Sequence, residues 1–398
     1  MKYSDSKLAD YSTDASISRG GIDLPFAALT ILLLTIGVIM VLSASYVRAF
    51  YTEDGNATYF FNRQLLFAVT GVIIMFLASR FPISLYRRFS YLLMLGTIVL
   101  LMLVLVIGVG TGGGVRRWIP LPGGQTIQPS EFAKIAVILV FADMICKYRN
   151  QMGTFRYGIV PFAIVLLILG VLLILEPHMS ATIIIFAIGA VMMFVGGTRL
   201  FWFVAGGAVV GILFFVVIVM FPYMSTRIMT WLDPFSNMQG DGYQIVQSLY
   251  AIGSGGMFGL GLGQSRQKYL YLPEEHNDFI FAVVCEELGF VGAVMILILF
   301  ALLITRGYWI AMHCRDRYSF LVATGISTLL AMQVILNVSV VTNTIPCTGI
   351  SLPFFSYGGS ALWIELAEMG ILLSISRDVP STPSERRKKK LSKTERVQ

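Results

Sequence analysis

Residues 259–290 read GLGLGQSRQKYLYLPEEHNDFIFAVVCEELGF, and this stretch passes from a polar loop into an apolar helix without a break. The loop is rich in glycine and basic residues, and the apolar run opens at Phe279. Asp278 is therefore expected at a membrane surface, where a carboxylate costs less than at mid-bilayer and its surroundings can tune its pKa. The residues alone leave two roles open for Asp278: a general base, or an N-terminal cap that suits the helix dipole.

The composition of the whole chain agrees with a membrane helix at this point. Hydrophobic residues make up 56% of the 398 residues, charged residues only 13%, and the mean hydropathy is +0.78. These values predict a polytopic membrane protein and exclude an ordinary soluble enzyme. The four cysteines lack paired spacing and neighbouring histidines, so neither a disulfide framework nor a zinc site is expected. The net charge of +7 is no sign of nucleic-acid binding, because the basic residues cluster beside spans and in the tail.

Runs of about twenty apolar residues predict an all-α fold of ten transmembrane helices. The expected spans are 25–47, 64–82, 89–109, 131–147, 157–176, 179–197, 200–221, 279–305, 319–345 and 355–376.

Ten spans place both termini on one side of the membrane, and the basic residues predict which side. With cytoplasmic termini, 21 of the 29 lysines and arginines lie in the cytoplasm, seven lie outside and Lys134 lies within a span. We therefore expect a cytoplasmic N-terminal tail (1–22), a membrane domain (23–377) and a basic cytoplasmic tail (378–398). The positive tail is expected to be a disordered anchor, with lipid or partner binding as the alternative.

This topology leaves two long loops outside, at about 110–130 and 222–278, the larger one between spans 7 and 8. In the larger loop, residues 227–231 are expected to form a short helix, and residues 242–252 show the helical spacing of an interfacial helix. The glycines of residues 253–264 could let backbone amides approach a phosphate.

Cations on the outer side run against the general charge bias and call for an explanation. Arg116 and Arg117 lie in the first outer loop, and Lys134 follows Glu131 by three residues in the fourth span. Glu131 and Lys134 share a helical face, so a local ion pair explains both. The functional interpretation, which we favour, is that Arg116, Arg117 and Lys134 hold a pyrophosphate.

Several acids lie within predicted spans and are candidates for function. Helical geometry puts Glu286 about 80° around the helix from Asp278, so Glu286 could share its cavity, whereas Glu287 should pair with a neighbouring helix. Glu365 and Glu368 share a face of the last span and either line a polar path or bind that helix to the bundle. His178, in an outer turn after Glu176, is expected to be solvated.

Several ordered motifs together resemble the SEDS family of shape, elongation, division and sporulation proteins, which includes FtsW, RodA and SpoVE. They are LPEEHNDFIFAVVCEELGFVGA from Leu272, TGISLPFFSYGGSALW from Thr348, GVRRWIP from Gly114, QPSEFAKI from Gln128 and DPFSNMQGDGYQIVQSLYAIGSGGMFGLGLG from Asp233. The resemblance covers residues 23–377. The WLDPFSN and QSRQKYLYLP segments are more similar to the FtsW and SpoVE branch than to RodA.

The resemblance implies a glycosyltransferase of the bacterial plasma membrane that polymerises lipid II into peptidoglycan on the outer face. It implies a class B penicillin-binding protein, a transpeptidase, as partner, together with other division proteins. The family's essential aspartate matches Asp278, its loop arginine Arg117 and its fourth-span lysine Lys134. The further candidates for substrate binding are Arg116, Glu131, Gln264, Lys268, His276 and Glu286.

A divalent cation, Mg²⁺ or Mn²⁺, could share the pyrophosphate site, although no metal-ligand spacing demands one. This chain also departs from the family pattern. Asn277 stands where threonine is common, Glu176 and His178 where glutamine and aspartate are common, and Glu365 and Glu368 add charge to a usually apolar span.

Septal wall synthesis is the role that the branch favours, with elongation of the RodA type as the alternative. The rival from another class is a transporter that flips lipid-linked precursors, and a third possibility is an inactive scaffold. Depth separates transport from polymerisation, because transport needs essential charges near the midplane and polymerisation needs them near the outer surface. Asp278, Arg117 and Lys134 are all expected near that surface, which favours the enzyme.

Overall fold

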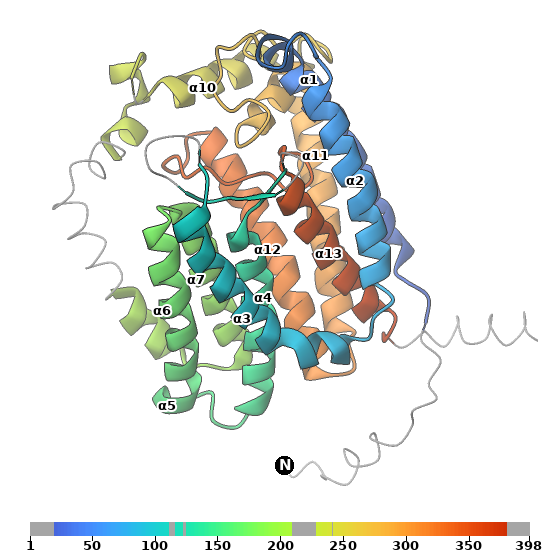
Figure 1. Cartoon of the computed structure of the whole chain (residues 1–398), viewed down its shortest axis with the longest axis vertical. Coiled ribbons are helices and arrows are strands. Elements are labelled where there is room, and N and C mark those ends of the chain that lie inside the picture. Colours follow the sequence, from blue (N-terminus) through green and yellow to red (C-terminus); the bar gives the residue numbers. More distant parts are fainter. Residues whose placement is uncertain (1–19, 111–115, 122–124, 209–227, 241, 380–398) are drawn as a thin grey trace, which may run out of the picture.

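The structure, a computed structural model, describes residues 20–110, 116–121, 125–208, 228–240 and 242–379. Helices dominate these residues, and two short strands form a hairpin (Figure 1). The elements are α1 (Leu24–Thr52), α2 (Tyr59–Ala78), α3 (Ile83–Ile107), β1 (Ile119–Leu121), β2 (Gln125–Ile127), α4 (Pro129–Lys147), α5 (Phe155–Gly158), α6 (Val160–Leu175), α7 (Met179–Gly196), η3 (Pro234–Asn237), α10 (Tyr243–Gly255), α11 (Ile280–Met312), α12 (Arg317–Val341) and α13 (Gly359–Ser376).

Eight helical segments among the described residues are long and apolar enough to cross a membrane. They are α1, α2, α3, the α5–α6 segment, α7, α11, α12 and α13. The chain is therefore a multi-pass membrane protein, as its composition predicts. The other two predicted spans correspond to α4, which carries four charged residues, and to 200–221, of which 200–208 are helical and the rest lies outside the described residues.

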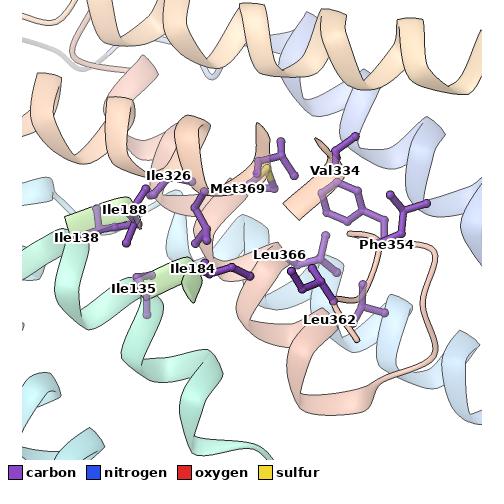
Figure 2. Close-up of a cluster of buried hydrophobic side chains, with 14 of the residues drawn as sticks. Ile135, Ile138, Ile184, Ile188, Ile326, Val334, Phe354, Leu362, Leu366 and Met369 are labelled. Atoms are coloured by element: carbon purple, nitrogen blue, oxygen red, sulfur yellow. The ribbon is translucent and has the colours of Figure 1, made fainter. Parts of the chain in front are cut away.

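The core of the bundle lies where α4, α7, α12 and α13 meet. Figure 2 shows Ile135 and Ile138 of α4 close to Ile184 and Ile188 of α7, with Leu362, Leu366 and Met369 of α13 nearby. All of these side chains are buried, and α4 is buried along almost its whole length. A central helix without a lipid-facing surface can carry charges that a peripheral helix could not.

The two ends of the described chain lie side by side. The amide of Gly20 donates to the carbonyl of Arg377 at 3.0 Å, and Arg306 forms an ion pair with Asp23 at 2.7 Å. This end of the bundle is called the terminal end below. The opposite end carries α10 and the hairpin and is called the loop end (Figure 1).

At the loop end, the structure confirms two expected helices and adds a hairpin. Residues 228–232 are helical before η3, and α10 contains the predicted segment 242–252 except its first residue. The antiparallel strands β1 and β2 pair Ile119 with Ile127. No strand was predicted here, because three-residue strands leave no periodic pattern to detect.

Helix α11 is broken at Gly289, whose φ of 67° and ψ of −172° are not helical. The helix also continues to Met312, seven residues beyond the predicted end at 305. Residues 253–264, the glycine loop, fill the break with backbone hydrogen bonds: Leu260 N to Glu286 O and Gly261 N to Glu287 O, both 3.0 Å, Phe290 N to Gly256 O, 2.9 Å, and Val291 N to Met257 O, 3.1 Å.

The close contact between the glycine loop and α11 requires glycine on both sides. A Cβ on Gly259 would lie 2.1 Å from the carbonyl oxygen of Glu287, and a Cβ on Gly289 would lie 2.2 Å from the amide nitrogen of Gly259. Both residues also have positive φ angles. The prediction that these glycines expose amides to a phosphate is therefore wrong for the amides of Leu260 and Gly261, which are bonded to α11.

Candidate active site at the loop end

A cavity of about 460 Å³ opens among the helix ends at the loop end. Its wall brings together segments that are far apart in the sequence: α2, the hairpin, α4, α7, the turn before α11, α12 and the segment leading into α13. The charged and histidine side chains that line it are Arg63, Arg117, Glu131, Lys134, His178, Glu274 and Asp278. The three residues that sequence analysis matched to the family's site, Asp278, Arg117 and Lys134, thus share one cavity.

Asp278 is not the cap of α11. The helix begins at Ile280, its N-cap is Phe279, and no side chain among the described residues caps it. The turn that holds Asp278 is fixed by Asn337 of α12, whose Nδ2 donates to the carbonyls of Asp278 at 2.8 Å and Ile350 at 2.6 Å. The geometry thus removes the capping alternative.

The surroundings of the Asp278 carboxyl favour its neutral form. Its pKa is raised to about 6, mainly by burial and also by the neighbouring Glu274, while Arg117 opposes the shift. A carboxyl that titrates near neutral pH is suited to accept a proton from a hydroxyl.

Gly349 lies directly against this carboxyl. Its φ is +67°, and a Cβ there would be 3.0 Å from Oδ2 of Asp278. We expect Gly349→Ala to lower the rate of the reaction about ten- to hundredfold, because the methyl group displaces the carboxylate. The strained backbone adds about 1–2 kcal/mol of destabilisation.

The matched control for this substitution is Gly197→Ala. Gly197 also has a positive φ, of +101°, but lies at the C-terminus of α7 with nothing within 4 Å of the added methyl. Turnover and thermal stability of both purified variants check the prediction. Equal turnover in the two variants would contradict a role for Gly349 in seating Asp278.

The basic side of the cavity is built from Arg117 and Lys134. Lys134 lies in the second turn of α4, is only 3% exposed and pairs with Glu131 at 2.6 Å. The predicted ion pair is therefore confirmed, and both of its members face the cavity. Arg117 donates through Nη2 to the carbonyl of Pro177, which ties the segment before β1 to the turn before α7.

Two further acids lie near Lys134. Glu365 and Glu368 of α13 are 5% and 4% exposed, and both act electrostatically on Lys134. Glu365 Oε2 also accepts a hydrogen bond from the amide of Phe354 at 3.0 Å. Lys134 is therefore the central cation of a buried group of acids that joins α4 to α13, which supports the bundle-binding interpretation of Glu365 and Glu368.

The expectation that His178 is solvated is wrong. His178 is 6% exposed, lines the cavity and has its Nε2 3.4 Å from Nε2 of Gln128. Burial first, and then Arg117 and Lys134, lower its pKa to about 3, so the imidazole is neutral at physiological pH. Burial likewise raises the pKa of Glu176 to about 8. Arg117 and Gln128, which are distant in the sequence, contact this turn, and a count of apolar residues cannot show such contacts.

Three of the other candidate residues lie outside the cavity wall. Arg116 is exposed and its Nη1 points to the carbonyls of Leu105 and Val106. Gln264 is exposed in the glycine loop. His276 is buried behind the wall, where its ring packs between Phe60 and Tyr357.

The expectation that Glu286 shares the cavity of Asp278 is also wrong. Its carboxylate faces the loop before α11, where it accepts hydrogen bonds from the Ser265 hydroxyl at 2.5 Å and the Arg266 amide at 2.9 Å. Glu287 accepts from Ser43 of α1 at 2.7 Å, which confirms its expected pairing with a neighbouring helix, and from Lys268 at 3.1 Å. Lys268, another candidate for substrate binding, is buried in this second cluster.

Sequence reasoning missed several residues of the cavity wall. Arg63 of α2 is one, and the sequence held a signal for it, because the predicted topology puts it among the cations on the outer side, against the charge bias. Others include Gln128, Tyr357 and the N-terminal end of α13, Gly358 to Ala361. Polar and glycine residues at the ends of spans leave no pattern that separates a cavity wall from an ordinary loop.

Among the described residues, no group of three or more histidine, cysteine, aspartate or glutamate side chains is arranged to hold a metal ion. The oxygen donors that face the cavity nearest the basic side belong to Glu131, which is paired with Lys134. Participation of a divalent cation remains a proposal.

Fold and cavity together define a class: a multi-pass helical membrane protein with an acid and a cation pair at the ends of its spans. The family profile described as cell cycle protein, FtsW/RodA/SpoVE, matches residues 24–380. The chain belongs to this family, as its motifs indicated.

Similar proteins cover nearly the whole chain. Stage V sporulation protein E of Bacillus subtilis is 46% identical over 357 residues, which are 89% of this chain and 97% of that protein. A probable peptidoglycan glycosyltransferase FtsW of Trichlorobacter lovleyi is 41% identical over 363 residues, 91% of this chain and 94% of that protein.

Solved structures show the same fold. A chain of a peptidoglycan synthase complex, described for its coordination of polymerization and crosslinking, is 28% identical with a TM-score of 0.76 and covers 91% of this chain and 99% of its own length. RodA of Thermus thermophilus is 26% identical with a TM-score of 0.64, over 91% of this chain and 98% of that one.

Proposed function

We propose that this protein is a peptidoglycan glycosyltransferase that polymerises lipid II on the outer face of the bacterial plasma membrane. Two relatives named probable peptidoglycan glycosyltransferase FtsW match this chain over more than nine-tenths of their own length. The observation that carries the proposal is the placement of Asp278, Arg117 and Lys134 on one cavity at the helix ends.

The reaction needs two kinds of group. A sugar hydroxyl must lose a proton as it attacks the anomeric carbon of a lipid-linked sugar, and the departing pyrophosphate must be stabilised by positive charge. Asp278 serves as the base, and Arg117 with Lys134 holds the pyrophosphate. A divalent cation, Mg²⁺ or Mn²⁺, could assist the same leaving group.

The position of the site argues against a lipid transporter. Asp278 precedes α11, Arg117 precedes β1 and Lys134 lies in the second turn of α4, so the groups gather near one membrane surface. Glu365 and Glu368 lie farther along α13, act electrostatically on Lys134 and do not line the cavity. The direct test is to incubate the purified protein with lipid II and to look for glycan chains. Absence of chains with a folded protein and its partner present would refute the proposal.

The proposed topology has ten spans with both termini in the cytoplasm. The contact between Gly20 and Arg377 supports an even number of crossings, and the charge bias supports the side. We expect a reporter fused after Arg377 to lie in the cytoplasm and one inserted near Asn237 to lie outside. Activity of a compartment-sensitive reporter pair at both positions checks this. Both reporters on one side would contradict ten spans.

The partner is proposed to be a class B penicillin-binding protein, with other division proteins in the same assembly. The support is the similarity to a chain of a complex in which polymerization and crosslinking are coordinated. Septal synthesis, in division or sporulation, is the proposed role, because the chain is 46% identical to a stage V sporulation protein and 41% identical to an FtsW.

A further inference from the structure

The N-terminus of α13 opens directly into the cavity. Gly358, Gly359, Ser360 and Ala361 all line it. The amides of the first turn of a helix have no partner within the helix, and together with the helix dipole they attract anions. The N-cap of α13 is Gly358, no side chain among the described residues caps it, and the first turn has no acidic residue.

The surrounding contacts fix this helix end between the two sides of the cavity. Toward α2, the amide of Gly358 donates to Oε1 of Gln64 at 3.4 Å. Toward α4, the amide of Gln128 donates to the Ser360 hydroxyl at 3.2 Å. The uncapped turn therefore lies between Arg63 of α2 and Lys134 of α4, which line the same cavity.

An independent sign of a ligand comes from His178. Its side chain is 94% buried (6% exposed) and lines the cavity, and its Nδ1 has no hydrogen-bond partner among the described residues. Gln128 links His178 to the start of α13. The side-chain Nε2 of Gln128 lies 3.4 Å from Nε2 of His178, and the backbone amide of Gln128 donates to the Ser360 hydroxyl. A buried polar atom without a partner costs about 1–3 kcal/mol, which a bound ligand would recover.

We infer that the first turn of α13, Gly358–Ala361, is the anion-binding floor of the cavity and receives a diphosphate group of the lipid-linked substrate. The backbone amides of Gly359, Ser360 and Ala361 contact the phosphate oxygens, Arg117 and Lys134 supply the charge, and His178 donates a hydrogen bond. The inference rests on the proposed function, which requires a diphosphate in this cavity, and adds residues that the family motifs do not assign. Glycine at 358 leaves the amides accessible.

A charge at the helix end tests the inference. Gly358→Asp places an anion where aspartate normally stabilises a helix, and Gly358→Asn is the neutral counterpart with the same capping ability. Gly358 has an extended backbone, and an added Cβ meets only the methyl of Ala361, at 3.5 Å. We expect the aspartate variant to bind farnesyl diphosphate in detergent at least about tenfold more weakly than the asparagine variant, and both more weakly than the wild type, because either side chain can cap the amides that the phosphate uses.

A second pair keeps the test decisive if position 358 tolerates no side chain. Ala361→Glu puts an acid in the first turn, where it suits the helix dipole, and Ala361→Gln is its neutral control. Farnesol, which lacks the diphosphate, should compete poorly with all variants. Equal binding of farnesyl diphosphate to the charged and neutral members of both pairs would overturn the inference. If binding depends on the introduced charge but the protein makes no glycan, the anion site is supported and the proposed polymerase activity is refuted.

Discussion

Asp278→Asn should abolish glycan synthesis from lipid II while the protein still inserts and folds. The substitution keeps the size of the side chain and removes its basicity. Loss of a general base typically lowers a rate about a hundred- to ten-thousandfold. The Asp278 side chain does not cap α11, and Asn337 holds the backbone carbonyl of Asp278. The substitution should therefore leave the local structure unchanged.

The controls separate chemistry from folding. The Asp278→Asn variant should retain its thermal stability and its affinity for the proposed transpeptidase partner, and Asp278→Glu should recover part of the rate. Near wild-type polymerisation by Asp278→Asn would contradict the assignment. Glu286 could not take over as the base, because its carboxylate accepts from Ser265 and does not line the cavity.

The pH dependence provides a second readout of the same group. A base must be deprotonated, and the pKa of Asp278 is raised by burial to about 6. The rate should therefore rise with pH through about 6 and level off above it. Stability should move in the opposite direction, because a carboxyl with a raised pKa in the folded state binds an extra proton there, and that contribution is lost as the pH rises through the folded pKa. A flat rate between pH 5 and 7 would contradict the role.

Lys134→Ala is expected to have the second-largest effect, on both stability and substrate binding. It leaves Glu131 without its ion-pair partner and Glu365 and Glu368 without the nearby cation. Removing one partner of a buried pair costs about 3–5 kcal/mol. Loss of a cation that contacts phosphate also weakens substrate binding by about 2 kcal/mol. Thermal unfolding and binding of the lipid-linked substrate measure the two effects.

The double substitution Lys134→Met with Glu131→Gln distinguishes the two roles of Lys134. It removes both charges of the ion pair and should regain part of the lost stability, since neither member is left uncompensated. Substrate binding should stay weak, because the cation is still missing. Recovery of both stability and binding would show that Lys134 serves only the bundle.

The sequence predicted the bundle well and the details of its site only in part. Hydropathy predicts where spans lie, because a membrane helix has a minimum length and few charges. It therefore located α1, α7 and α12 closely, and it found α4 as a span in spite of its charges. It missed the break at Gly289, since a broken helix and a continuous one have the same apolar composition.

Placement of the site residues depended on motifs more than on periodicity. Asp278, Arg117 and Lys134 were matched to a family pattern, and the structure brings them to one cavity. Glu286 was placed by helical geometry counted from Asp278, which failed because the helix starts after that residue. His178 was misjudged because the burial of a turn depends on segments elsewhere in the chain, here the one containing Arg117.

The break in α11 makes its first part a short strut with a hinge at one end. The strut runs from Ile280 to Leu288, which is about 13 Å of helix, and Asp278 lies just beyond its far end. The glycine loop forms backbone hydrogen bonds with α11 on both sides of Gly289. A tilt of about 10° at Gly289 would carry the carboxylate about 2 Å, whereas a misplacement of about 1 Å can slow an enzyme about a hundredfold. Any contact that displaces the glycine loop would therefore change the rate of synthesis without reaching the cavity.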